Sequence, residues 1–280
     1  MHETREHTPQ PLTVAASVLS DPGCVRETNE DNGRHINPSV FADRNERGTL
    51  TIVADGMGGH SSGEVASEMA VELIGRYFYD NESNSVEQAL RQAIEQASAD
   101  IFDSAIADTR FFGMGTTVVA LVIRDNAAWV AHVGDSRLYR LRGSHMELLT
   151  MDHSQVMEMV KMGLISFDEA QSHDDKNVIL RAVGTQPNVE VEISGPFEVV
   201  EGDQFLLCSD GLCDMVPDEE IAGIWSEATE IHDAVQRLVE VAKQRGGSDN
   251  ITVAIVRASA RLPEVARKIP VTKEIEVQAE

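Results

Sequence analysis

The sequence contains few cysteines. Only three of the 280 residues are cysteine: Cys24, Cys208 and Cys213. An odd and sparse set does not form a disulfide framework and is typical of a reducing compartment. A thiol phosphatase would need an arginine six positions after its nucleophilic cysteine, and acidic residues stand at all three of these positions. The sequence therefore argues against nucleophilic thiol chemistry.

Basic residues are also scarce. The chain has 23 lysines and arginines against 47 aspartates and glutamates, so its formal net charge is −24. A nucleic-acid-binding protein needs a basic face, so we expect no nucleic-acid partner. We interpret most of the acidic residues as a solvated surface, and a few of them as candidates for a cation site.

The sequence has no long apolar run. No stretch approaches the roughly 20 apolar residues that span a bilayer. Residues 1–11 lack the basic-then-apolar layout of a signal peptide. We therefore expect a cytoplasmic protein with no membrane partner, and we expect a monomer. Hydrophobic residues still make up 42% of the chain, which is enough for a large core.

The hydrophobic periodicity predicts an α+β chain. Strands are predicted at residues 12–19, 50–54 and 250–256, in three consecutive runs within 115–142, and as a hairpin over 197–211 with its turn at 201–203. Helices are predicted at residues 63–79, 86–107, 218–227 and 231–244, with two short helices within 154–170. Residues 33–48 are predicted to be a loop. Consecutive strands with tight turns favour antiparallel sheets, with the helices outside them.

Several acidic residues stand at the ends of apolar strands, beside glycine or asparagine. They are Asp55, Asp135, Asp210 and Asp249, with the acidic pair Glu30 and Asp31 soon after the first strand. A single Asp-Gly is an ordinary turn, but these aspartates adjoin strands that are predicted to be buried. Clustered like charges repel unless a cation neutralises them. Oxygen ligands suit Mg²⁺ or Mn²⁺, and two such ions can activate a water for phosphate-ester hydrolysis.

Two further residues fit a phosphate site. The stretch VADGMGGH, residues 53–60, places an aspartate and His60 around three glycines, which allow another group to approach the backbone closely. Arg26 precedes the acidic pair, and a guanidinium can bind two phosphate oxygens at once. Taken alone, Arg26 would be a surface arginine and His60 a loop histidine.

Seven motifs occur in an order that is characteristic of a known family. They are VRETNEDN (25–32), ADGMGGH (54–60), GTT (115–117), HVGDSRLY (132–139), LTMDHS (149–154), CSDGLCDMV (208–216) and GGSDNITV (246–253). Together they resemble the bacterial branch of the metal-dependent type-2C (PPM) protein serine/threonine phosphatases, over about residues 12–256. The resemblance implies an αββα sandwich of two antiparallel sheets flanked by helices. It also implies a leader at 1–11, a catalytic domain at 12–257 with a flap at about 150–184, and a tail at 258–280.

The resemblance implies a set of metal ligands. By position, Asp55 would bridge two Mn²⁺ or Mg²⁺ ions, and the carbonyl of Gly56 would also be a ligand. Asp210 and Asp249 would complete the first site. Glu30 and Asp31 would serve the second ion, with Asp31 acting through waters. In many bacterial members a third ion is held by the position of Asp135 together with that of Asp210.

The resemblance also implies how the substrate is handled. Arg26 would bind the substrate phosphate, and His60 would protonate the departing serine or threonine oxygen. Asp55 would be a catalytic metal ligand and not a nucleophile. The implied function is hydrolysis of phosphoserine and phosphothreonine in proteins, opposing a serine/threonine kinase. Two alternatives stay open: an inactive phosphopeptide-binding scaffold, which we would expect to lose ligand positions, and a hydrolase of small phosphate esters.

Overall fold

The computed structural model describes residues 12–38, 47–58 and 62–260. The predicted leader and most of the predicted tail lie outside these ranges, as does His60. None of the described helices has the length and apolar character that a membrane span requires.

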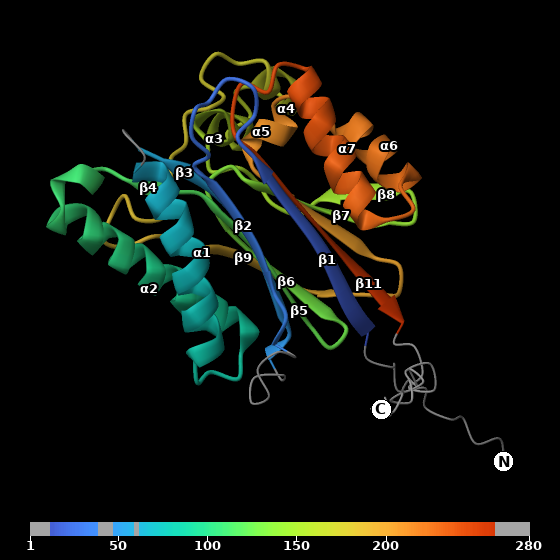
Figure 1. The fold of residues 1–280 in the computed structure, drawn as a ribbon, viewed down its shortest axis with the longest axis horizontal. Coiled ribbons are helices and arrows are strands. Elements are labelled where there is room, and N and C mark those ends of the chain that lie inside the picture. The colour runs from blue at the N-terminus through green and yellow to red at the C-terminus, as the bar shows by residue number, and fades with distance from the viewer. Residues whose placement is uncertain (1–11, 39–46, 59–61, 261–280) are drawn as a thin grey trace, which may run out of the picture.

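Two antiparallel sheets form the centre of the molecule (Figure 1). The first sheet contains, in spatial order, β1 (Leu12–Asp21), β11 (Ile251–Ala260), β10 (Gln204–Cys208), β7 (Arg137–Arg142) and β8 (His145–Leu148). The second contains β2 (Asp31–Ile36), β3 (Thr49–Met57), β5 (Val118–Arg124), β6 (Ala127–Val133) and β9 (Glu192–Glu198), and the short β4 (Gly115–Thr116) pairs with β3. The predicted fold class is confirmed.

A pair of helices covers the outer face of each sheet. The second sheet packs against α1 (Ser62–Asp80) and α2 (Val86–Ala107), and the first packs against α6 (Asp218–Glu227) and α7 (Ile231–Gln244). Strand β5 shows why both faces of a sheet are apolar. Val118, Ala120 and Val122 pack toward α1 and α2, while Val119 and Leu121 pack into the core between the sheets. This alternation follows from the two-residue period of a strand.

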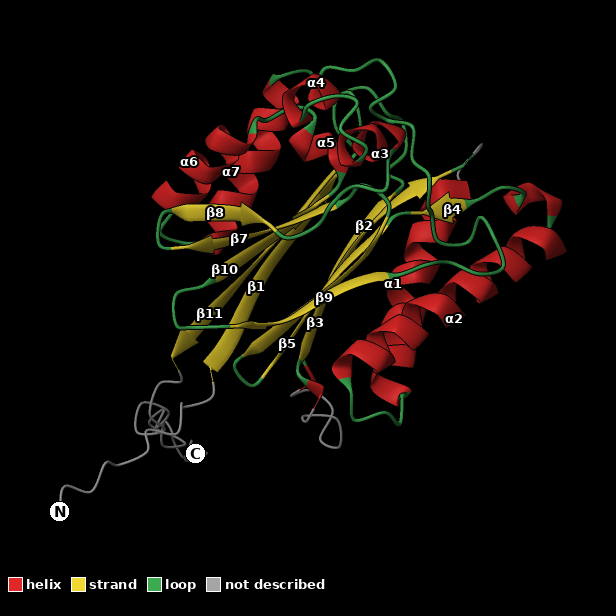
Figure 2. Cartoon of the chain, turned by 180° about the vertical axis from the view of Figure 1, so that it is seen from behind, coloured by secondary structure: helices red, strands yellow, loops and turns green. Residues whose placement is uncertain are grey.

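The helices agree closely with the prediction. The bounds of α2, α6 and α7 are those predicted from periodicity. Ser85 caps α2 by accepting a hydrogen bond from the backbone of Gln88. Helices α3 (Gln155–Lys161) and α4 (Phe167–Gln171) are the two predicted short helices. Figure 2 shows them beside α5 (Asp210–Cys213), which was not predicted, at one end of the sandwich between the two helix pairs.

Two predictions of strand pairing were wrong. The chain passes from β6 in the second sheet to β7 in the first through residues 134–136. Strands β9 and β10 also belong to different sheets, so the predicted hairpin over 197–211 does not form. A strand buried on both faces carries no pattern that identifies its sheet. In a sandwich, a short connection can therefore lead to the facing sheet as well as to a neighbouring strand.

Strand β2 was also missed, because its sequence is polar and was interpreted as loop. It forms through full antiparallel pairing with β3, from Asp31 opposite Asp55 to Ile36 opposite Leu50. Gly33 lies where the sheets approach, and a Cβ there would meet side chains of Val18 and Thr252 at 2.9 Å. Strand β11 continues to Ala260, beyond the predicted end at Val256.

Candidate active site

The acidic residues singled out in the sequence converge at one end of the sandwich. Asp31 begins β2 and pairs directly with Asp55 near the end of β3. Asp210 follows β10, and Asp249 precedes β11, its antiparallel neighbour. Asp135 lies in the connection between β6 and β7. Because the end of one antiparallel strand lies beside the start of the next, this topology brings five positions to the same edge.

The electrostatics of Asp55 show that these carboxyl groups act on one another. Burial raises the pKa of Asp55 well above its ordinary value, and the charges of four other aspartates raise it further. The four are Asp31, Asp210, Asp135 and Asp249, in decreasing order of effect. These are the aspartates that were predicted to be metal ligands.

Three other carboxyl groups of the cluster are perturbed in the same direction. Burial raises the pKa of Asp210 to about 8, and the nearby charge of Asp135 adds to the effect. Burial raises the pKa of Asp31 to about 6, although hydrogen bonds from Ser209 and Thr252 partly lower it. Burial also raises the pKa of Asp135 to about 6. The charged forms of these groups are therefore costly in the absence of a compensating cation.

Two carboxylate oxygens lack any hydrogen-bond partner. Within the part of the chain that the structure describes, Asp31 Oδ1 and Asp210 Oδ1 are both buried and unpaired. Buried polar atoms are nearly always satisfied, so such orphans need an explanation. A hard divalent cation, which prefers carboxylate oxygens, provides one. The residues present thus fit the Mg²⁺ or Mn²⁺ ions that the resemblance implies.

The backbone at Gly56 is packed so closely that only glycine fits. A Cβ there would lie 2.1 Å from the carbonyl oxygen of Gly63 and 2.5 Å from that of Glu30. The Gly56 N–H donates to the Glu30 carbonyl at 3.1 Å. The close packing against Gly63 joins the end of β3 to the start of α1, and the hydrogen bond joins it to the acidic pair. Because Gly56 has no side chain, nothing of its own blocks access to its carbonyl, as the predicted ligand role requires.

Hydroxyl groups orient two of the acidic residues, and the sequence analysis did not assign them this role. Ser209 Oγ donates to Asp31 Oδ2 at 2.7 Å and accepts from the Thr252 N–H at 3.0 Å. The Asp55 N–H donates to Thr117 Oγ1 at 3.1 Å, and the Thr117 N–H donates to the Asp55 carbonyl at 2.8 Å. Both hydroxyls stand in quoted motifs, CSDG and GTT. Ser209 directly precedes Asp210, which was the available signal for it, whereas Thr117 has no acidic neighbour in the sequence.

Asn250 has a similar supporting role for the loop that carries Arg26 and Glu30. Its Oδ1 accepts from the Glu30 N–H at 2.8 Å, and its Nδ2 donates to the carbonyls of Pro22 and Thr28. The Asn250 side chain therefore makes hydrogen bonds with three backbone groups within residues 22–30. The motif GSDN contains this asparagine, but pairing with a distant loop cannot be deduced from local sequence.

Arg26 lies at the rim of the acidic cluster. Its guanidinium donates to Asp249 Oδ2 at 2.8 Å, and about half of its side chain is exposed. The hydrogen bond and charge of Asp249 raise the pKa of Arg26, and the charges of Glu30 and Asp55 add to this. Burial raises the pKa of Glu30, and the charge of Arg26 lowers it. Arg26 is placed where an incoming anion could reach it, and His60 lies outside the described residues.

A cavity of about 230 Å³ adjoins the acidic cluster. Asp135 and Asp210 line it together with the segment that was predicted to be a flap, including Met157 and Lys176. This segment has a small core of its own around Val156, Met157 and Ala170. An ion pair of 2.8 Å links Lys176 to Asp214, which follows α5.

Comparison with known proteins gives consistent results. The chain matches the Protein phosphatase 2C family over residues 28–252. It is 39% identical over 246 residues to the serine/threonine phosphatase Stp of Listeria welshimeri, covering 86% of this chain and 94% of that protein. It is similar to the crystal structure of the Streptococcus agalactiae serine/threonine phosphatase, with a TM-score of 0.80, 34% identity, and coverage of 89% of this chain and 100% of that one. A structure of the PstP catalytic domain in complex with two manganese ions gives a TM-score of 0.75 at 32% identity, covering 89% and 99% of the two chains.

The sandwich and these similarities define a serine/threonine protein phosphatase. The chain belongs to the protein phosphatase 2C family, as its motifs had indicated.

Binding of a divalent cation should stabilise the fold. The acidic cluster is crowded and has two orphan oxygens, so a cation that binds only the folded state raises the melting temperature by mass action. We expect millimolar Mn²⁺ to raise the melting temperature of chelator-treated protein by several degrees. Asp210→Asn should reduce this shift, whereas Asp103→Asn, an exposed change on α2, should leave it unaltered. An unchanged melting curve for the wild type would contradict a cation site.

The metal-free protein should also lose stability as pH rises. Asp210 has a folded-state pKa of about 8, above its ordinary value of 3.8. The unfolded chain therefore releases this proton first, and the cost to the folded state grows between about pH 4 and pH 8. We expect chelator-treated Asp210→Asn to gain stability over the wild type across this range, by a few kcal/mol in urea unfolding. A difference that stays constant with pH would argue against the raised pKa.

Proposed function

We propose that this phosphatase hydrolyses phosphoserine and phosphothreonine in proteins by a metal-dependent reaction. The observation that carries the proposal is the convergence of buried aspartates around Asp55, with unpaired oxygens on Asp31 and Asp210. The two manganese ions in the similar PstP structure support it. The ions, Mn²⁺ or Mg²⁺, would supply Lewis acidity and an activated water for attack on phosphorus.

Residues of this chain would hold two ions in distinct ways. Asp55 lies among the other carboxylates and would contact both ions, and Gly56 would offer its carbonyl. Asp210 and Asp249, on the first sheet's side of the cluster, would complete one site. This assignment makes the aspartates ligands and not nucleophiles, so no phosphoaspartate is expected.

The remaining acidic residues complete the proposed ligand set. Glu30 and Asp31 would serve the second ion, with Asp31 acting through waters at its unpaired Oδ1 while Ser209 holds its Oδ2. Asp135 lies beside Asp210, whose pKa its charge raises, so the two together are the proposed ligands of a third ion.

Arg26 and His60 would handle the substrate. The Arg26 guanidinium would bind two phosphate oxygens, which requires it to exchange part of its contact with Asp249 for the substrate. His60 would donate a proton to the departing alkoxide, since an imidazole can be poised near neutral pH.

The biological setting follows from the proposed chemistry. The substrates would be phosphoproteins, and the enzyme would oppose a serine/threonine kinase. The catalytic domain would comprise residues 12–257 with a flap at about 150–184. A monomer in the cytoplasm remains our prediction from the sequence. An inactive scaffold is disfavoured because every proposed ligand position retains its acid or glycine.

The proposal is tested by phosphate release from a phosphothreonine peptide, with Mn²⁺ and with chelator. We expect release only with metal, and a loss of at least 100-fold in Asp210→Asn, since each removed ligand weakens the electrostatic stabilisation of the transition state. Asp103→Asn serves as the matched control and should retain full activity. No release under any metal would favour the phosphopeptide-binding scaffold. Faster turnover of small phosphate esters than of any phosphopeptide would favour the third alternative.

Replacing Arg26 should affect substrate binding more than metal binding. Arg26→Ala removes the guanidinium from the rim, so KM for the phosphopeptide should rise roughly tenfold. It also frees Asp249, so Mn²⁺ affinity should stay equal or increase. Steady-state kinetics and a Mn²⁺ titration check both effects. A lower Mn²⁺ affinity together with an unchanged KM would contradict the assigned role.

A further inference from the structure

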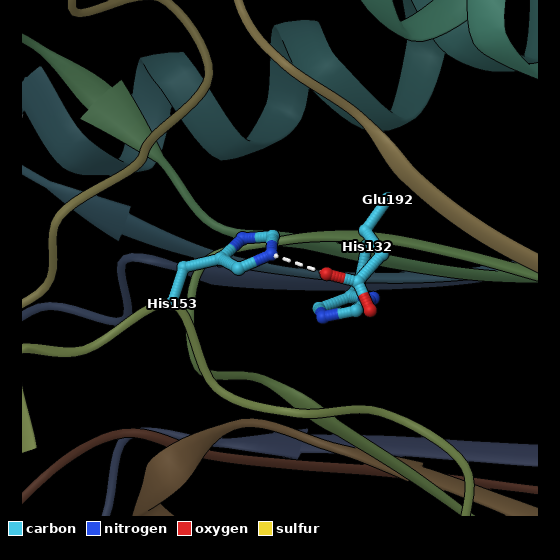
Figure 3. Close-up of side chains that lie close together, drawn as sticks. All are labelled: His132, His153 and Glu192. Carbon is cyan, nitrogen blue, oxygen red and sulfur yellow. Dashed lines mark hydrogen bonds and ion pairs between the residues drawn. The ribbon is translucent and has the colours of Figure 1, made fainter. Parts of the chain in front are cut away.

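A second group of titratable side chains lies outside the acidic cluster: His132, His153 and Glu192 (Figure 3). His132 on β6 faces Glu192, its cross-strand partner on β9. His153 comes from the segment that leads into α3. The two histidines are almost fully buried, at 3% and 1% exposure, and the proposed chemistry uses neither of them.

Two histidines and a glutamate are a donor set that zinc sites use, but the geometry here opposes a metal. The two imidazole rings are stacked, with centroids 4.5 Å apart and planes 15° from parallel. The nitrogen lone pairs lie in the ring planes, so two stacked rings cannot both point at one ion. His132 Nε2 is also within 2.9 Å of the Met151 carbonyl, which makes it a hydrogen-bond donor.

Hydrogen bonds fix the tautomer of His153. The Gly134 N–H donates to His153 Nδ1 at 3.1 Å, so Nδ1 is the unprotonated nitrogen of the neutral ring. Nε2 then carries the proton and donates to Glu192 Oε2 at 3.2 Å, the contact drawn in Figure 3. Burial lowers the pKa of His153, the neighbouring His132 lowers it further, and the hydrogen bond to Glu192 raises it. Neither nitrogen of His153 is left for a metal.

These contacts connect His153 to three separate parts of the molecule. Its backbone N–H donates to the Gly134 carbonyl at 2.9 Å, so His153 holds both polar groups of Gly134. The Leu180 N–H, from the end of the flap segment, donates to the His153 carbonyl at 2.7 Å. Glu192 on β9 receives the ring proton. Gly134 itself directly precedes Asp135, a proposed metal ligand.

The turn that His153 holds also supports Asp55. Gly134 has a φ of +106°, and a Cβ there would lie 2.7 Å from the Thr117 side chain. Ser136 Oγ is 2.7 Å from Thr117 Oγ1, which accepts from the Asp55 N–H. The hydrogen bonds of His153 with Gly134, the backbone of residues 134–136 and the hydrogen bonds of Thr117 therefore connect His153 to Asp55.

We propose that His153 is a positioning residue that fixes the Gly134–Asp135 turn for cation binding and links it to the end of the flap segment. The inference rests on the proposed function for the identity of the cation. It does not depend on His153 touching substrate or metal. The feature that carries it is the pair of hydrogen bonds that Gly134 makes with His153, one through the backbone and one through the ring.

Two conservative variants separate the two ends of the ring. His153→Asn keeps an acceptor near the position of Nδ1 and loses the contact with Glu192. His153→Gln keeps a donor near the position of Nε2 and loses the acceptor for Gly134. Both retain the backbone bonds to Gly134 and Leu180. Glu192→Gln, which keeps an acceptor for Nε2, serves as the control for the other end.

Two quantities are measured. The first is hydrogen exchange at the Gly134 amide, and the second is Mn²⁺ binding without substrate, which is monitored through the signal of free Mn²⁺. Leaving a buried N–H without an acceptor should accelerate Gly134 exchange about tenfold in His153→Gln. It should weaken Mn²⁺ binding at the site that Asp135 and Asp210 would form by a similar factor. His153→Asn and Glu192→Gln should stay within about twofold of the wild type. Thermal unfolding verifies that each variant is folded.

The outcomes separate this inference from the proposed function. Equal losses in His153→Asn and His153→Gln, or no change in either, would overturn the positioning role, because a merely structural histidine does not distinguish its two nitrogens. A wild type that binds no Mn²⁺ would overturn the proposed function. In that case the rates of Gly134 amide exchange in His153→Gln, His153→Asn and the wild type would still test the positioning role.

Discussion

The repulsion among buried carboxylates is the constraint on which the site depends. Burial makes the charge of Asp55 expensive, and the charges of four other aspartates add to this cost. A bound cation would relieve this repulsion, and a firmly held backbone beneath the cluster keeps the carboxyl groups together. The cation would account for the unpaired oxygens of Asp31 and Asp210. The backbone is held by the hydroxyl, amide and imidazole contacts that surround the cluster.

The sandwich also holds this backbone through its topology. Antiparallel pairing places the starts and ends of neighbouring strands at one edge, so residues from distant parts of the sequence meet there. Gly56 and Gly134 then allow the backbone to approach Gly63 and Thr117 more closely than any side chain would permit. Beside this edge, helices α3 and α4 form a small core of their own. The cavity beside the cluster is lined by acidic residues of this edge and by residues of these helices.

Local periodicity predicted the helices well because a helix is stabilised by contacts within about four residues. The bounds of α2, α6 and α7 were correct for this reason. Strand β2 was missed because its polar sequence becomes a strand only by pairing with β3. The hairpin over 197–211 was wrong because β10 is buried on both faces, a pattern that suits either sheet, and β9 pairs with β6. The acidic residues were predictable because their chemistry is unusual beside apolar strands, whereas Ser209, Thr117 and Asn250 are ordinary residue types.

The sequence alone determined the residue types: six acids beside glycine or asparagine, a phosphate-binding arginine candidate, and a motif order that identifies the family. These features are local, so they can be recognised without knowledge of the fold. Tertiary structure alone decided which groups touch. It placed Asp31 opposite Asp55, paired Arg26 with Asp249, and brought both nitrogens of His153 to partners far along the chain. Such contacts depend on how the two sheets pack, and packing is a property of the whole chain that no short segment encodes.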